Sequence, residues 1–110
     1  MKRIYQFIQT PIFSVLLDKA GEDGLLEAIE DEVIRNPMGG SLIKGGIRKI
    51  RVAPSDRPGG KRGGYRVWFF HHVPEDVYLL FLLDKREAGD LTSEQEKILA
   101  LEFKKAFERK

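Results

Sequence analysis

The stretch that decides the fold is residues 65–72, YRVWFFHH, followed closely by residues 77–83, VYLLFLL. The first stretch is rich in aromatic and β-branched side chains, which favour extended strands. The second is almost wholly apolar, as expected of a strand that is covered on both faces. The residues between them, VPED, predict a turn. We therefore expect the two strands to pair antiparallel.

Another strand is predicted just upstream, at residues 47–52, IRKIRV. Successive side chains of a strand point to opposite faces of the sheet. This alternation places Ile50 and Val52 on one face, and Lys49 and Arg51 on the other. The strand therefore presents two cations side by side.

Glycine-rich segments lie on both sides of this strand. Residues 53–64 contain four glycines and two prolines, which predicts a hairpin loop longer than an ordinary tight turn. Paired glycines at 39–40 and 45–46 bracket the preceding segment, for which we expect a flexible connection.

The N-terminal part predicts a fourth strand and two helices. Residues 3–9 alternate well enough for a strand. Thr10 is expected to cap a helix that starts at Pro11 and ends at Gly21. A second helix is expected over residues 22–35, with an apolar stripe and six acidic residues on its outer face and first turn.

The last element is predicted to be a helix that opens with residues 93–96, SEQE, which read as a capping box. The expected order is strand, helix, helix, three strands, helix. We expect one domain over residues 1–110, of class α+β, with a small curved antiparallel sheet of about four strands and helices packed on one face. The aromatic strands carry surplus apolar surface, which indicates either a groove for a partner or a well-filled core.

Composition excludes several kinds of chemistry. The chain has 110 residues and no cysteine, which rules out a disulfide scaffold, a zinc ribbon and a thiol nucleophile, and favours the cytoplasm. No apolar run approaches the ~20 residues that span a bilayer, so we expect no membrane association. The neighbours His71 and His72 point to opposite faces of a strand, so we expect neither a metal nor another cofactor.

Charge is distributed unevenly along the chain. The formal net charge is only +2, but residues 44–66 hold eight basic residues and one acidic residue, a net charge of +7. The rest of the chain carries −5. A basic block of this kind is typical of a site for a polyanion, although a solvated basic loop would look the same.

Four cations are expected to converge on one surface of the sheet. Lys49 and Arg51 share a strand face, Arg66 lies on the next strand, and Arg86 follows the last strand. Such a cluster binds phosphates and stabilises charge in a phosphoryl transition state. It also lowers the pKa of a lysine, which could then take a proton from a ribose 2′-hydroxyl. This chemistry alone does not distinguish RNA cleavage from binding.

Three segments resemble the RelE/ParE superfamily of toxins, and most closely the HigB-like branch of type II toxin–antitoxin systems. They are residues 46–53, GIRKIRVA; residues 60–67, GKRGGYRV; and residues 78–91, which begin YLL and include DKRE before Asp90-Leu91. The resemblance covers nearly the whole chain and includes the element order βααβββα. It implies a ribosome-dependent, metal-free endoribonuclease that cuts mRNA and so inhibits translation.

The resemblance also implies roles for individual residues. Lys49 matches the proposed general base and Arg51 a phosphate binder. Arg66 matches the arginine that stabilises the transition state, and Arg86 another phosphate contact. Further cations that we expect to bind RNA are Arg48, Lys61, Arg62 and Lys85.

The sequence departs from the family pattern near its C-terminal end. Many RelE members place a tyrosine there for base stacking, whereas this chain has Asp90-Leu91-Thr92. His71 is a candidate general acid or base, and Tyr65 or Lys61 could take the missing role equally well.

The implied partners are a cognate antitoxin of the helix-turn-helix type, the ribosome and its mRNA. Operator DNA would be bound only through the toxin–antitoxin complex. The antitoxin's negative segment would suit the +7 block. Two alternatives stay open: a non-catalytic toxin of the same superfamily that inhibits DNA gyrase, and a nucleic-acid-binding module that does not cleave.

Overall fold

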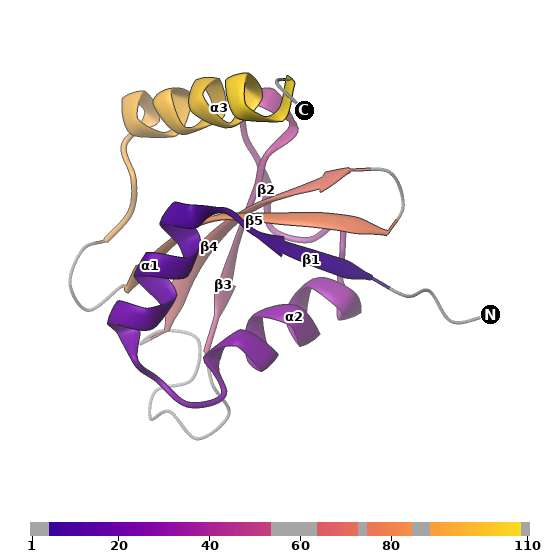
Figure 1. Cartoon of the computed structure of the whole chain (residues 1–110), viewed down its shortest axis with the longest axis vertical. Coiled ribbons are helices and arrows are strands. Elements are labelled where there is room, and N and C mark those ends of the chain that lie inside the picture. The colour runs from indigo at the N-terminus through magenta and orange to yellow at the C-terminus, as the bar shows by residue number, and fades with distance from the viewer. Residues whose placement is uncertain (1–4, 54–63, 73–74, 85–88, 109–110) are drawn as a thin grey trace.

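The described part of the chain folds as an α+β structure with three helices and an open five-stranded sheet (Figure 1). The computed structural model describes residues 5–53, 64–72, 75–84 and 89–108. The elements, in chain order, are β1 (Gln6–Gln9), α1 (Pro11–Ala20), α2 (Leu25–Arg35), β2 (Ser41–Leu42), the 3₁₀ turn η1 (Lys44–Gly46), β3 (Arg48–Val52), β4 (Tyr65–His72), β5 (Asp76–Asp84) and α3 (Ser93–Glu108).

The sheet is mixed, so the expectation of about four antiparallel strands is wrong both in the number of strands and in their direction. The strand order is β1-β5-β4-β3-β2, with β1 parallel to β5 and every other pair antiparallel. The short connection at residues 73–75 forces β4 and β5 to run antiparallel, and β3 pairs antiparallel with β4 although residues 53–64 separate the two strands. No such constraint acts on β1, because both α1 and α2 separate it from the next strand and it reaches β5 through tertiary packing alone.

The fifth strand, β2, lies in the segment for which a flexible connection was expected. It is two residues long and pairs Ser41 with Lys49 and Leu42 with Arg48. Gly40 permits this approach, because its φ is +74° and a Cβ there would collide with the Lys49 carbonyl oxygen. The paired glycines therefore mark a close approach between two chain segments.

Helices cover both faces of the sheet, so the prediction that all of them pack on one face is wrong. Val67 and Phe69 point toward α1 and α2, where they join the larger core cluster with Phe13 and Ile29. Trp68 points the other way and packs in a second cluster with residues of α3. Figure 1 shows α3 apart from α1 and α2. Much of the surplus aromatic surface on these strands is therefore covered by α3.

A bulge in β5 supports this second cluster. Trp68 pairs with Phe81 and the next residue, Phe69, pairs with Leu79, so Leu80 is the extra residue. As a result Leu80 and Phe81, although adjacent in sequence, both belong to the α3 side of the sheet.

The helix ends agree with the sequence in α1 and differ in α3. The Thr10 hydroxyl accepts a hydrogen bond from the Phe13 amide, and Gly21 ends α1 with φ +59°. In α3 the capping box is Thr92 with Gln95, each side chain accepting from the other residue's amide. The expected box at Ser93 and Glu96 is therefore wrong by one residue, which leaves the Glu96 side chain for another partner.

No helix among the described residues is long and apolar enough to cross a membrane.

Candidate functional site

Three of the four predicted site residues lie on the α3 face of the sheet. In the β3–β4 pair, Lys49 is opposite Trp68 and Arg51 is opposite Arg66. Ile50 and Val67, which lie between them along the two strands, belong to the core under α1 and α2. The side chains of Lys49, Arg51, Arg66 and Trp68 therefore point to the opposite face of the sheet. Two arginines directly across from each other repel, and an anion between them would relieve that repulsion.

Lys49 is held by two carboxylates, Asp90 from the segment before α3 and Glu96 from the first turn of α3. Its Nζ lies 3.0 Å from Asp90 Oδ2 and 3.0 Å from Glu96 Oε2. Its side chain is only 16% exposed, as is expected of a cation packed between a strand and a helix. Lys49 is therefore a paired cation, and its ammonium group has a fixed position.

Glu96 joins the lysine to the core. The same Oε2 that contacts Lys49 accepts a hydrogen bond from the Trp68 indole Nε1 at 3.0 Å. The Glu96 side chain is 14% exposed, and the Lys49 Nζ lies 5.9 Å from the centre of the Trp68 ring. A carboxylate with two donors in a shielded place is strongly fixed.

The hypothesis that Lys49 has a lowered pKa is wrong. Burial of the ammonium lowers the pKa of Lys49, but hydrogen bonds from Lys49 to Glu96 and Asp90, and the negative charges of both, outweigh burial and raise the pKa. The sequence argument counted the neighbouring cations and missed the two acids. Because both acids stabilise the charged form, the role that this geometry favours for Lys49 is that of a fixed ammonium group.

Arg66 is fixed by the same segment. Its Nε donates to the Gly89 carbonyl oxygen at 2.9 Å and lies 3.9 Å from Asp90 Oδ2. Asp90 also accepts from the Leu91 amide at 2.8 Å. Asp90 therefore lies between Lys49 and Arg66, and at 39% exposure it is the most accessible of the three side chains.

A pocket of about 400 Å³ opens beside these cations. Its volume would accommodate a nucleotide-sized group. Residues from α2, β2, β3, β4 and the connection between α2 and β2 line it: Glu32, Asn36, Gly40, Ser41, Lys49, Ile50, Arg51 and Arg66. Arg51 is exposed, and no carboxylate of the described residues forms an ion pair with it. The pocket thus combines two fixed cations with one exposed guanidinium.

Other predicted residues lie elsewhere. Arg48 points to the opposite face from Lys49 and donates to the carbonyl oxygens of Met38, at 2.8 Å, and Gly39, at 3.4 Å. It holds the turn before β2. His71 lies toward the other end of β4, with its ring 5.8 Å from that of Tyr5. Arg86, Lys85, Lys61 and Arg62 lie outside the described residues.

Sequence reasoning missed Asp90, Glu96 and Trp68 as members of this site. A signal for Glu96 was present, because Glu96, Leu99 and Phe103 share one side of a helix. A single acid in an otherwise apolar stripe predicts a buried partner cation. Asp90 had no comparable signal, since it precedes the helix and no periodicity applies to it.

The sequence matches no model of a known protein family. Among the described residues, no group of three or more acidic or histidine side chains is arranged to hold a metal ion.

Proposed function

We propose that the protein is a RelE-like toxin of a type II toxin–antitoxin system and that it cuts mRNA on the ribosome in the cytoplasm. The observation that carries the proposal is the convergence of Lys49, Arg51 and Arg66 on one pocket. The strands hold these cations in fixed positions beside a cavity. Such an arrangement suits the binding of a phosphate group that must stay in place during the reaction. The cognate antitoxin and the ribosome enter the proposal through the sequence resemblance.

The proposed reaction is attack of a ribose 2′-oxygen on the adjacent phosphorus. The 2′-oxygen–phosphorus bond forms while the bond from phosphorus to the 5′-oxygen breaks. The departing 5′-oxygen takes a proton from a water molecule, and the proton removed from the 2′-hydroxyl returns to solvent. The products are a 2′,3′-cyclic phosphate and a 5′-hydroxyl. Arg66 and Arg51 bind the phosphate oxygens and stabilise the added charge. Lys49 acts as a fixed cation.

Asp90 is our candidate for the group that takes the 2′-hydroxyl proton. It is a carboxylate next to both Lys49 and Arg66, and more exposed than either of them. General bases must lie within hydrogen-bond reach of the proton that they remove. Asp90 thus replaces Lys49 in the role that the family resemblance implied.

The test is to induce the wild type and an Arg66→Ala variant, and to map mRNA ends in both. We expect new ends and growth arrest with the wild type, and at least a hundredfold less cleavage with Arg66→Ala. Lys19→Ala, an exposed lysine of α1, is the matched control. Equal cleavage by wild type and Arg66→Ala would refute the site assignment.

A second candidate is a nucleic-acid-binding module that does not cleave. The pairing of Lys49 with two carboxylates favours it, since the site then lacks a neutral lysine. In that case purified protein would retain labelled RNA and leave mRNA intact. Assays of DNA supercoiling would distinguish the gyrase-directed alternative, in which DNA breaks would accumulate without mRNA cleavage.

A further inference from the structure

The helix α3 packs on the sheet without burying any residue completely. Leu99 and Phe103 reach the second core cluster, whereas Ile98 and Leu101 are each 52% exposed. Half-exposed apolar residues also occur on α1 and α2, but Leu101 adjoins other apolar residues that line a cavity beside α3. The helix therefore has apolar surface left over after it covers the sheet.

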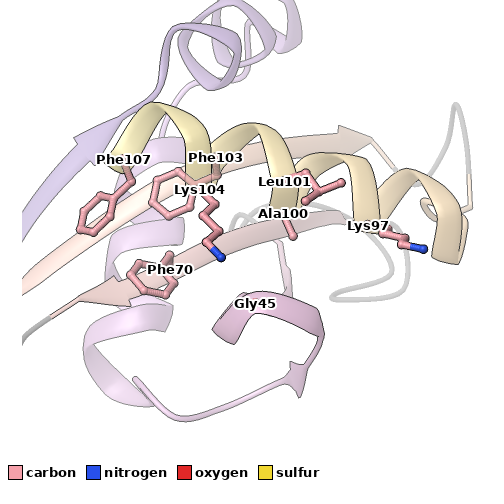
Figure 2. Close-up of a pocket in the computed structure, with 8 residues that line it drawn as sticks. All are labelled: Gly45, Phe70, Lys97, Ala100, Leu101, Phe103, Lys104 and Phe107. Carbon is pink, nitrogen blue, oxygen red and sulfur yellow. The ribbon is translucent and has the colours of Figure 1, made fainter. Parts of the chain in front are cut away.

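Figure 2 shows a groove along α3 on this side. The groove has a volume of about 480 Å³. Gly45 of η1 and Phe70 of β4 form one wall of the groove. The α3 residues Ala100, Leu101, Phe103 and Phe107 form the other wall. A side chain at position 45 would press on the Ala100 Cβ at 3.3 Å, so the glycine helps to keep the groove open.

Among the described residues that line this groove, two are charged, and both are lysines: Lys97 and Lys104. They are seven positions apart on α3, which corresponds to two turns and about 10 Å along the axis. Both are exposed. The groove therefore combines an apolar floor with two positive charges at a defined spacing.

These features favour a protein segment over RNA. The phenylalanine rings contact one another, with ring centres 5.3 Å apart for Phe70 and Phe103 and 5.5 Å for Phe103 and Phe107. Because these rings pack against one another, little of their faces is open to solvent. Binding of single-stranded RNA relies on bases that stack on open aromatic faces. Ala100 and Leu101 complete an aliphatic surface suited to apolar side chains.

A second copy of the chain is a poor occupant. The acidic helix α2 has the required charge, but its apolar residues Leu25, Ile29 and Val33 are completely buried in its own core. That stripe is therefore not available to a neighbouring molecule, and we favour a segment of another protein as the occupant.

We infer that the α3 groove, defined by Phe70, Lys97, Leu101, Phe103, Lys104 and Phe107, binds an amphipathic helix of a partner protein whose carboxylates flank an apolar stripe. Helices bind such grooves through apolar side chains at positions i, i+3, i+4 and i+7. That this partner is the antitoxin rests on the proposed function. The negative segment of the antitoxin would then bind α3 and not the +7 block.

The experiment uses the full chain and a labelled synthetic peptide of about 14 residues, long enough for nearly four helical turns. The peptide carries leucines at helical spacing, with glutamates beside them. One control peptide has the same composition in scrambled order, and another has lysine in place of every glutamate. Fluorescence polarisation measures the binding of each peptide.

We expect the wild type to prefer the acidic amphipathic peptide to both controls. Reversing both groove charges, with Lys97→Glu and Lys104→Glu, should weaken this binding by about tenfold. The same variant should gain binding of the lysine peptide. The matched control is Lys19→Glu with Lys105→Glu, which changes the net charge equally at exposed residues outside the groove lining; it should bind as the wild type does.

Several results would overturn the inference. Equal weakening by both double variants would show attraction by net charge, and equal binding of the scrambled peptide would show that no helix is recognised. Dimers that Leu101→Glu abolishes would assign the groove to a second copy. Displacement of the peptide by a labelled RNA, lost on reversal of Lys97 and Lys104, would assign it to nucleic acid.

Peptide binding and mRNA cleavage are measured separately. If the protein binds the peptide but leaves mRNA intact, the docking site is supported and the proposed function is refuted. If the protein cuts mRNA but shows no preference for the acidic amphipathic peptide, only the docking site is refuted.

Discussion

At the scale of residues, the site depends on one carboxylate with two donors. Glu96 accepts from Trp68 and contacts Lys49, and all of these contacts are at 3.0 Å. A shielded cation that loses its partner costs more free energy than an exposed ion pair contributes. The geometry therefore makes Glu96 important for stability as well as for the position of Lys49.

Glu96→Gln should lower the free energy of unfolding by about 1–3 kcal/mol, because the charge that faces Lys49 is removed. Urea denaturation followed by the fluorescence of Trp68, the single tryptophan of the chain, measures the change. Glu94→Gln is the matched control, since Glu94 is an exposed acid in the same first turn. A loss for Glu94→Gln as large as that for Glu96→Gln would contradict the assignment.

Stability should also depend on pH at the alkaline end. The pKa of Lys49 is raised above its ordinary 10.5 in the folded chain, so the folded state holds this proton more tightly than the unfolded state. The stabilisation is then complete below pH 10.5 and is lost as the pH rises through the folded pKa. As the pH rises from 10.5 through the folded-state pKa of Lys49, the free energy of unfolding should fall more for the wild type than for Lys49→Met. Urea denaturation at each pH measures both. Parallel curves for the two proteins would refute this.

At the scale of elements, α3 begins one residue earlier than its sequence suggests. Thr92 and Gln95 exchange the hydrogen bonds of the capping box. The local pattern allows either Thr92 or Ser93 to act as the cap, because both are good N-cap residues and each has Gln or Glu three positions later. The contact of Glu96 with Lys49 and Trp68 decides between them.

Thr92→Ala should therefore destabilise the protein by about 1 kcal/mol through loss of the cap. Ser93→Ala should change stability by less than about 0.5 kcal/mol. Thermal unfolding followed by circular dichroism compares the two. The reverse ranking would restore the capping box predicted from the sequence.

At the scale of the whole molecule, the two faces of the sheet are packed unequally. The cluster under α1 and α2 contains twelve buried residues, and the cluster under α3 contains four. Local opening costs less free energy where fewer apolar groups are buried. The α3 face is also the one that carries both the candidate site and the α3 groove.

Amide hydrogen exchange should consequently be faster in α3 than in β4 and β5, with α2 between them. Exchange measured by mass spectrometry on peptide fragments resolves these elements. The acidic amphipathic peptide should slow exchange in α3 and leave α2 unchanged. Protection of α3 equal to that of the central strands, without peptide, would show that the helix is held as firmly as the core.

The sequence by itself determined most of the secondary structure and the shared face of Lys49 and Arg51. Periodicity, turns and the Thr10 cap are local properties, set by backbone geometry and side-chain size. They also placed Arg66 on the strand next to this pair, whereas the register that sets Arg66 opposite Arg51 came from the structure. The roles of four cations outside the described residues, Lys61, Arg62, Lys85 and Arg86, stay predictions.

Tertiary structure alone decided the direction of β1, the face that α3 covers and the acids that pair with Lys49. Asp90 follows Lys49 by 41 residues, and no local pattern relates two residues so far apart. Their contact depends on which side of the sheet the chain crosses after β5. Because α3 packs on the sheet, it shields Lys49 from water, and a shielded charge requires a partner of opposite sign. Asp90 and Glu96 supply that partner, while Arg51 stays exposed.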